Sequence, residues 1–409
     1  MHEIFLISVN GEDRPGVTHS LSTILATYDV TILDIGQAVI HKMLSLGMLV
    51  RVPDTAHSAP ILKDLLFKAH ELGVQIQFEP VPVEDYNLWV SQQGKARHII
   101  TLLGERLEAE HIASVTELLA THGLNIDIIH RLSGRIPMDE MAKAPYACVE
   151  MSVRGIAEDA DELRARFLQL SHDTGIDIAF QADDLYRRHR RLVAFDMDST
   201  LIQTEVIDEL AKAAGVGEEV STITEAAMRG ELDFKESLRQ RLALLKGLDE
   251  SVMAGIAERL PLTDGAERLL SMLNHLGYTT AIISGGFTYF GNYLQKKLGV
   301  DYVFANELEI IDGKLTGNVI GDIVDGEKKA DCLRQLAQEE NISLHQVVAV
   351  GDGANDLPML RLAGLGIAFR AKPLVIQHAR HALSTVGLDG ILYLIGVRDR
   401  EATELPLAE

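Results

Sequence analysis

The sequence is poor in cysteine, in long apolar runs and in positive charge. Its two cysteines, Cys148 and Cys332, lie far apart and in no metal-binding spacing, so they predict reduced thiols rather than a disulfide framework. The longest apolar stretches, such as Ala363–Phe369, are far shorter than a membrane span. The N-terminal stretch MHEIFLISVN has no basic segment and no small-residue cleavage site, so we expect no signal peptide and a cytoplasmic protein.

The shortage of positive charge also limits the partners of this chain. Lysine and arginine number 38 against 60 aspartates and glutamates, and the formal net charge is −22. Such a surface disfavours nucleic acid and anionic membranes as partners, and any phosphate site must supply its own local positive charge. One basic run, Arg187–Arg191, departs from this trend. It has no interleaved aromatic residues, and we interpret it as a solvated edge before a buried strand.

The length of 409 residues predicts two to four domains. Within residues 1–85, apolar periodicity predicts the order βαββαβ, which is typical of a ferredoxin-like domain. The same order returns in residues 95–183, where Ala120-Thr121 repeats Ala26-Thr27, with an inserted loop over 133–145. Two copies indicate duplicated domains rather than a solenoid. The predicted strands of the first copy are 3–9, 30–39, 44–52 and 74–81, and its helices are 17–27 and 61–72.

Residues 190–398 follow a different pattern, in which short apolar strands alternate with helices. This alternation predicts an α/β domain with a Rossmann-like, doubly wound parallel sheet covered on both faces. Residues 204–262 interrupt it with a charged, helical stretch after the first strand, which we interpret as a helical cap. The four predicted strands are 192–195, 280–283, 302–305 and 347–350.

Four polar clusters follow strands or begin helices of this predicted sheet, where open α/β sheets bind ligands. Each cluster alone is typical of a turn or a helix cap, but four in this order are rare by chance. They are Asp196-Met197-Asp198-Ser199-Thr200, Ser284-Gly285-Gly286, Lys328-Lys329 and Gly351-Asp352-Gly353-Ala354-Asn355-Asp356.

These residue types suit phosphoryl transfer from an ester. A carboxylate can act as the nucleophile and form an aspartyl-phosphate, and the leaving alkoxide needs a proton. Further carboxylates can hold Mg²⁺, which takes oxygen ligands and neutralises phosphate charge. Lys329 adds a second cation, and Ser284 with the Gly285 amide can bind phosphate oxygens at a helix start.

The motif order DxDST, SGG, K and GDGxNDxxML resembles that of the haloacid dehalogenase superfamily of phosphotransferases, over roughly residues 191–395. The resemblance implies that Asp196 is the nucleophile and that Asp198 is the general acid and base. It further implies a Mg²⁺ site and phosphate contacts. The metal ligands would be Asp196, the backbone carbonyl of Asp198, and Asp352; the phosphate or substrate contacts would be Ser284, Gly285, Lys329 and Asn355; and Asp356 would orient the metal site or Lys329.

The cap sequence DFKESLRQRLALLKG closely resembles the cap of phosphoserine phosphatases. This resemblance implies hydrolysis of O-phospho-L-serine to L-serine and phosphate, the last step of serine biosynthesis. Glu205 would then take the substrate ammonium and Arg241 its carboxylate, while Met228 and Phe234 would form an apolar wall.

The N-terminal repeats resemble ACT domains, which often bind amino acids and pair across their sheets. The turn Asn10–Gly16 (NGEDRPG) matches their ligand-binding turn, whereas the second copy reads LGERLEA and lacks Arg-Pro-Gly. The resemblance implies a homodimer and a possible effector, L-serine, bound near the first turn. The candidate effector residues are Asn10, Gly11, Asp13 and Gly16.

Two alternatives remain open at this stage. The same chemistry can move the phosphoryl group to another alcohol, such as homoserine, if that acceptor outcompetes water. A protein of a different class, an amino-acid-sensing regulator with an inactive catalytic domain, would keep the fold and lose the chemistry. The presence of Asp196, Asp198, Lys329 and Asp352 argues against this regulator.

Overall fold

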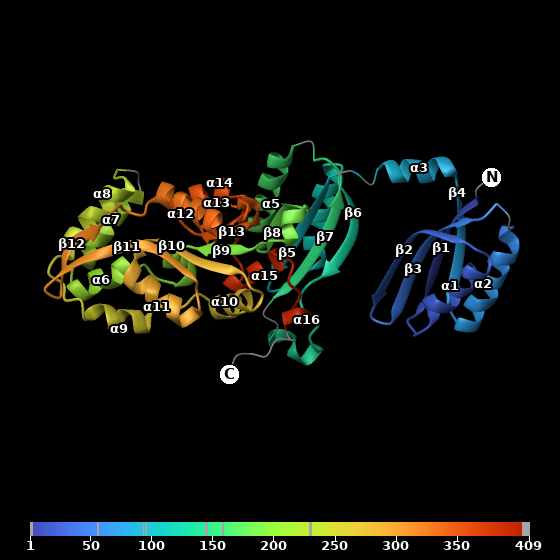
Figure 1. The fold of residues 1–409 in the computed structure, drawn as a ribbon, viewed down its shortest axis with the longest axis horizontal. Coiled ribbons are helices and arrows are strands. Elements are labelled where there is room, and N and C mark those ends of the chain that lie inside the picture. Colours follow the sequence, from blue (N-terminus) through green and yellow to red (C-terminus); the bar gives the residue numbers. More distant parts are fainter. Residues whose placement is uncertain are drawn as a thin grey trace. The chain divides into compact units, whose positions relative to one another are not determined.

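The computed structural model describes residues 3–54, 57–92, 94, 96–143, 146–157, 159–228 and 231–402. The chain divides into two compact units, residues 1–95 and 96–409, and each is described by itself. Among the described residues, no helix is long and apolar enough to cross a membrane. The predicted fold class is confirmed in both units (Figure 1).

The first unit is a four-stranded antiparallel sheet in the order β2-β3-β1-β4 with two helices on it. Helix α1 buries Val17, Leu21 and Leu25, which are four residues apart and therefore lie on one face. The exposed helix α3 follows β4 and is not predicted by the sequence analysis. The elements are β1 (Glu3–Glu12), α1 (Val17–Thr27), β2 (Thr31–Ile40), β3 (Met43–Val52), α2 (Ser58–Leu72), β4 (Gln75–Val81) and α3 (Val83–Ser91).

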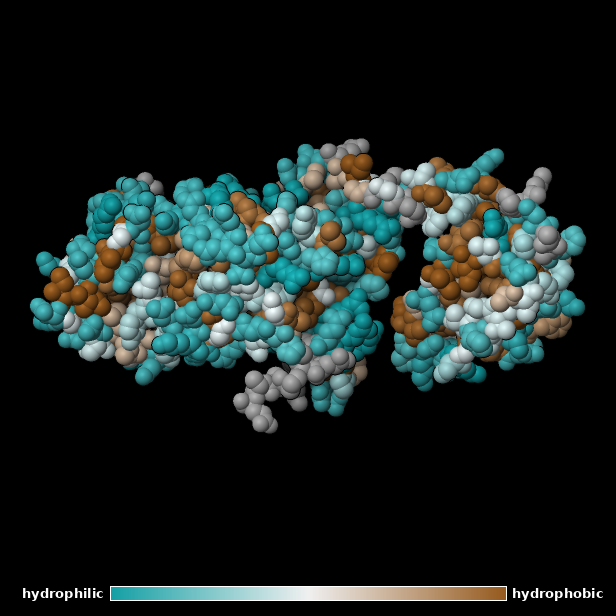
Figure 2. Space-filling model, viewed as in Figure 1, coloured by the Kyte–Doolittle hydropathy of each residue, from teal (hydrophilic) through white to brown (hydrophobic). Residues whose placement is uncertain are grey.

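Strand β2 forms an edge of this sheet, and nearly all of its residues are exposed. Its exposed side chains include Ile35 and Ile40, the latter 76% accessible, and apolar surface gathers on this unit in Figure 2. An edge strand carries unpaired backbone groups and is a site where another strand can add.

The second unit begins with another ferredoxin-like sheet, in the order β6-β7-β5-β8. This order matches that of the first unit, as the repeat predicts. Within the segment predicted to be an inserted loop, Met138–Lys143 forms a 3-10 helix. The elements are β5 (Arg97–Gly104), α4 (Ala109–Thr121), β6 (Asn125–Arg131), β7 (Ala147–Arg154), α5 (Ala160–Thr174) and β8 (Asp177–Ala182).

The rest of the second unit is built on a seven-stranded sheet in the order β12-β11-β10-β9-β13-β14-β15. All neighbours are parallel except β11 and β12. The first strand, β9, pairs with both β10 and β13, so the strand order reverses beside it. Such a switch point is where these sheets bind ligands. The strands are β9 (Leu192–Phe195), β10 (Thr279–Phe287), β11 (Tyr302–Ile311), β12 (Lys314–Ile320), β13 (Val347–Gly351), β14 (Leu365–Phe369) and β15 (His381–Leu383).

Helices cover this sheet, and four of them form the predicted cap between β9 and α10 (Figure 1). The cap helices are α6 (Val206–Ala214), α7 (Gly217–Met228), α8 (Phe234–Leu244) and α9 (Val252–Arg259). The others are α10 (Ala266–His275), α11 (Thr288–Leu298), α12 (Gly326–Glu339), α13 (Leu357–Leu362), α14 (Pro373–His378), α15 (Ile391–Leu394) and α16 (Asp399–Ala402).

The β11–β12 hairpin is absent from the sequence-based prediction, although the sequence contains its signal. Asp312 and Gly313 join the strands with φ of 51° and 75°. Positive φ at both positions is typical of the two-residue turn that Asp-Gly favours between strands. The prediction ends the strand near residue 305, and the observed strand continues to Ile311.

The second ferredoxin-like domain shares its core with the seven-stranded domain. Leu103, Leu132 and Cys148 belong to the same buried apolar cluster as Leu388 and Ile391. Strand β8 also contacts β15. The boundary near residue 190 therefore separates two patterns in the sequence without separating two apolar cores.

Buried polar contacts join the same two domains. The Asp177 carboxylate on β8 accepts hydrogen bonds from the amides of Ser384 and Thr385, at 2.7 and 3.0 Å, and from the Thr385 hydroxyl. The Gln181 amide donates to the Leu394 carbonyl at 3.1 Å. Asp177 is only 2% exposed, and its removal would leave the part-buried hydrogen bonds from the Ser384 and Thr385 amides without their acceptor.

The basic run is exposed at Arg188, His189 and Arg191, as its composition predicts, but its other two arginines are buried. Arg187 is 3% exposed and pairs with Glu150 on β7. Arg190 is 8% exposed and donates to the carbonyls of His345 and Gly364. Buried arginines need such partners, and all three partners lie far away in the sequence. The prediction was wrong for these two arginines because local composition does not show tertiary partners.

Candidate active site

Asp196 lies directly after β9, at the switch point of the sheet. It is 5% exposed, and its own amide donates to the Val350 carbonyl at 2.8 Å, which ties the loop to β13. One carboxylate oxygen accepts a hydrogen bond from the Met197 amide at 2.7 Å. The other oxygen lies 2.8 Å from Nζ of Lys329. The carboxylate is thus held by two donors and lies at the end of the central strand.

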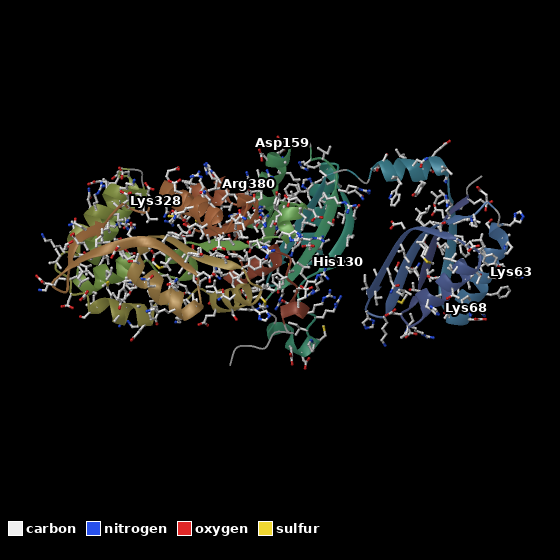
Figure 3. The ribbon with its side chains drawn as sticks, in the orientation of Figure 1. Lys63, Lys68, His130, Asp159, Lys328 and Arg380 are labelled. Carbon is white, nitrogen blue, oxygen red and sulfur yellow. The ribbon has the colours of Figure 1, made fainter. Side chains whose placement is uncertain are left out.

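Lys329 occupies the first turns of α12 and is completely buried. Its ammonium lies between two carboxylates, 2.8 Å from Asp196 and 2.7 Å from Asp356. Burial lowers the pKa of Lys329, but the two carboxylates outweigh burial and hold it above its ordinary value. Lys328, its neighbour in the motif, lies at the surface (Figure 3). Only the second lysine of the pair therefore reaches the site.

Three carboxylates gather at this end of the sheet. Oxygens of Asp196, Asp352 and Asp356 all lie within 4.8 Å of one another. Burial, followed by repulsion from Asp196, raises the pKa of Asp352 to about 8 and that of Asp356 to about 7. The raised pKa values show that Lys329 compensates only part of the negative charge of these carboxylates. Oxygen ligands of this kind suit a hard divalent cation.

Asp198 lies two residues beyond Asp196 and is 9% exposed. One of its oxygens accepts a hydrogen bond from the Val206 amide at 3.0 Å. Burial, and then the charges of Glu205 and Asp196, raise the pKa of Asp198 well above its ordinary value. A raised pKa favours the protonated form of the carboxyl group, which can donate its proton.

The C-terminal part of β10 brings a hydroxyl and a bare backbone to the same place. Ser284 is fully buried, and its oxygen accepts a hydrogen bond from the Gly286 amide at 2.9 Å. A Cβ on Gly286 would lie 2.4 Å from an Asp198 oxygen, and a Cβ on Gly285 would lie 2.8 Å from the Phe234 ring. Both positions therefore exclude a side chain, because the site and the cap approach the backbone closely.

The cap supplies further predicted residues. Arg241 on α8 is half-buried, and its guanidinium interacts electrostatically with the carboxylates of Glu205 and Asp208. Its closest hydrogen-bond acceptor is the Ser237 carbonyl at 3.4 Å, so the guanidinium carries no carboxylate partner among the described contacts. Phe234 starts α8 and faces Gly285. The side chain of Met228, the last residue of α7, lies outside the described residues.

Asn355 lies in the loop after β13, half-buried. Its backbone carbonyl lies against the start of α12, where a Cβ on Gly326 would meet it at 2.8 Å. The structure thus places residues of all four predicted clusters at one end of the sheet.

Two hydroxyl groups that the sequence analysis leaves without a role contact predicted site residues. The Ser199 hydroxyl donates to the Glu205 carboxylate at 2.9 Å. The Thr200 hydroxyl donates to Asp352 at 3.1 Å. Their position inside the DxDST cluster was the available signal. Ser199 also has a φ of 55°, an uncommon conformation for a residue with a side chain.

The predicted effector turn belongs to the first unit. Asn10 and Gly11 are the last but two and last but one residues of β1, and Gly16 precedes α1 with a φ of 95°. A Cβ on Gly11 would lie 2.7 Å from the Val74 side chain. The close contact at Gly11 and the positive φ at Gly16 thus account for glycine at both positions without a ligand. Asn10 and Asp13, whose side chains are exposed, are the residues that remain for a ligand.

Family models match three parts of the chain. Residues 3–79 and 96–181 each match an ACT domain, and residues 193–361 match haloacid dehalogenase-like hydrolases. Among curated proteins, a phosphoserine phosphatase of Streptomyces coelicolor is 42% identical over 97% of this chain and 93% of its own length. One from Mycobacterium tuberculosis is 40% identical over 96% of this chain and 93% of its own length.

Among solved structures, this chain is also similar to a probable phosphoserine phosphatase and to a haloacid dehalogenase family hydrolase. A probable phosphoserine phosphatase from Vibrio cholerae is 35% identical with a TM-score of 0.58, over 76% of this chain and 90% of that one. A haloacid dehalogenase family hydrolase from Salmonella enterica serovar Typhi is 31% identical with a TM-score of 0.61, over 73% of this chain and 99% of that one. With two ACT domains before a haloacid dehalogenase-like domain, and with relatives of this identity along nearly its whole length, the chain belongs to the phosphoserine phosphatase family.

Proposed function

We propose that this protein hydrolyses O-phospho-L-serine to L-serine and phosphate through an aspartyl-phosphate on Asp196, with Mg²⁺ as its cofactor. The observation that carries the proposal is the buried ammonium of Lys329 between Asp196 and Asp356, beneath a cap that presents Glu205 and Arg241. The relatives named above are phosphoserine phosphatases, which supports this substrate.

Each residue of the site has a separate role in the proposed reaction. An Asp196 oxygen attacks phosphorus and the ester bond breaks, while Asp198 gives its proton to the leaving serine oxygen. In the second half, Asp198 takes a proton from the attacking water, and Asp196 is released with phosphate. Lys329, Ser284, the Gly285 amide and Asn355 would bind phosphate oxygens. Mg²⁺, held by Asp196, Asp352 and the Asp198 carbonyl and oriented by Asp356, would neutralise charge on the transferring phosphoryl group.

Phosphate release from a panel of phosphorylated amino acids and sugars, with and without Mg²⁺, tests this function. We expect O-phospho-L-serine to be the preferred substrate and EDTA to abolish the activity. Product analysis in the presence of homoserine covers the phosphotransferase alternative. A phosphorylated sugar as the preferred substrate would contradict the proposal. The relatives do not favour a phosphotransferase or an inactive regulator.

Mg²⁺ should stabilise the protein more at pH 8 than at pH 6. The raised pKa values of Asp352 and Asp356, about 8 and about 7, exceed the unfolded value of about 3.9. Between about pH 4 and about pH 8, the metal-free folded chain therefore binds more protons than the unfolded chain. Its stability falls as the pH rises through this range. A cation bound only to the folded state offsets this loss, by about 2.7 kcal/mol at 100 times its Kd. Calorimetry in EDTA and in excess Mg²⁺ measures the difference in Tm, and a gain equal at both pH values would contradict the expectation.

Arg241→Ala should weaken catalysis of phosphoserine far more than catalysis of phosphoethanolamine, which lacks the carboxylate. A charge-assisted hydrogen bond to that carboxylate would contribute about 2 kcal/mol, or about 30-fold in kcat/KM. The matched control is Arg239→Ala, since this arginine lies on the same helix with its side chain 63% exposed. Equal losses on both substrates would make Arg241 a structural residue. The corresponding test of Glu205 uses a phosphate ester without the amino group.

L-serine should also bind the first ACT domain near Asn10 and Asp13 and lower the activity of a homodimer. Because a ligand shifts an equilibrium only by differential affinity, Asp13→Ala should weaken inhibition and leave the KM for phosphoserine nearly unchanged. Gly16→Val would strain the turn, whose φ is 95°, so Asp13→Ala is the cleaner variant. Asp85→Ala on α3 is the matched control. Unchanged inhibition in Asp13→Ala, measured by steady-state kinetics, would assign the effect to product binding at the catalytic site.

A further inference from the structure

Asn306 on β11 is a buried side chain that joins two parts of the site. It is 2% exposed and lies in a strand of otherwise mostly half-buried residues. Its Nδ2 donates to the Gly285 carbonyl at 2.7 Å, and its Oδ1 accepts from the Val324 amide at 2.8 Å. The carbonyl can only accept and the amide can only donate, so this orientation of the Asn306 side chain is the one that satisfies both.

The hydrogen bond from Asn306 to Gly285 lies where the regular pairing of β10 with β11 is interrupted. Strands β10 and β11 pair in register up to Ile283 and resume at Phe287, opposite Asn306, with an irregularity between them. The backbone of Gly285 lies in this irregular stretch and lacks a regular ladder partner. The Asn306 side chain takes the place of that partner for the carbonyl of the half-buried Gly285.

The hydrogen bond from Val324 to Asn306 holds the segment that leads into α12. Val324 precedes Asp325, whose side chain caps α12 by accepting from the Lys328 amide at 2.9 Å. The Lys329 amide in turn donates to the Asp325 carbonyl at 2.8 Å. Because Lys329 is the cation beside Asp196, the position of Val324 sets where that ammonium lies.

We propose that Asn306 is a positioning residue that sets the spacing between the phosphate-binding backbone at Gly285 and the Lys329 ammonium. The inference rests on the proposed function and deepens it. The two segments also touch: a Cβ on Gly285 would lie 3.5 Å from the Val324 carbonyl oxygen. The amide of Asn306 holds both segments at once, and no shorter or apolar side chain can do so.

Asn306→Ala should lower kcat for phosphoserine by about 100-fold, the loss expected when reacting groups shift by about 1 Å. It should also weaken inhibition by inorganic phosphate. The matched control is Asn274→Ala, because the Asn274 amide also donates to two backbone carbonyls, those of Leu298 and Gly299, at 3.3 and 3.0 Å. Asn274 lies on α10, outside the four clusters. This control should lose Tm and keep kcat within about twofold.

Asn306→Asp gives a readout that general destabilisation does not. Its carboxylate can accept from Val324 but repels the Gly285 carbonyl, and burial raises the pKa of such a group. Protonation restores a donor, so the ratio of variant to wild-type kcat should rise as the pH falls from 8 to 6. This variant also serves if Asn306→Ala does not fold. A kcat and phosphate inhibition within twofold of wild type in either folded variant, or activity losses that follow Tm equally at Asn306 and Asn274, would overturn the proposal. An inactive wild-type enzyme would instead refute the proposed function.

Discussion

Asp196→Asn should reduce phosphoserine turnover by at least about three orders of magnitude. The amide that replaces the carboxylate is not a nucleophile, and removal of a catalytic nucleophile in other enzymes costs this much or more. The fold should survive, because the substituted side chain keeps an oxygen for the Met197 amide at 2.7 Å. Phosphate release measures the loss of turnover. Rapid-quench labelling with radioactive phosphoserine measures the loss of the phosphorylated protein.

The matched control for this variant is Asp331→Asn. Asp331 lies on the same domain with its side chain 64% exposed and pairs only with Arg334 among the described contacts, so kcat should stay within about twofold of wild type. Near-normal turnover in Asp196→Asn, or a labelled protein that retains its phosphate, would rule out an aspartyl-phosphate at this residue.

Removal of residues 1–95 should leave a folded, active enzyme, whereas removal of residues 1–185 should leave an aggregating one. The first cut follows the division between the two compact units. The second removes Leu103, Leu132 and Cys148 from a shared buried cluster. Each large apolar side chain buried there contributes about 1.5–3 kcal/mol, and a domain has only about 5–15 kcal/mol of stability in total.

The polar contacts add to this loss. Without Asp177, the amides of Ser384 and Thr385 lose their acceptor, and without Glu150 the buried Arg187 loses its partner. Solubility, circular dichroism and kcat of the two truncated proteins measure the outcome. A soluble, cooperatively unfolding protein that lacks residues 1–185 and keeps wild-type kcat would contradict the prediction. The shorter truncation also removes the proposed effector turn, so it should abolish any inhibition by L-serine at that site.

Much of the architecture could be predicted because its signals are local. The apolar residues of α1 recur every four residues, and the strand-helix alternation after residue 190 implies a parallel sheet. The motif residues could be placed together for the same reason: the carboxyl ends of parallel strands meet at one edge of the sheet. Thus Asp196, after β9, and Asp352, after β13, lie within 4.8 Å despite their distance in the chain. The Asp-Gly turn of the β11–β12 hairpin was an equally local signal, but the sequence analysis did not use it.

Other features depend on burial and on partners distant in the sequence, which composition cannot show. The sequence reads Lys328-Lys329, and only the start of α12 decides that Lys329 points inward and Lys328 outward. Arg187 lies in a run that looks solvated in sequence, yet it is buried against Glu150 in the fold. The sequence by itself predicted the proposed chemistry, since the residue types and their order at the strand ends carry it. The tertiary structure alone decided that the second ACT domain belongs to the catalytic core and that Asn306 joins two parts of the site, because both depend on contacts between segments that no local pattern relates.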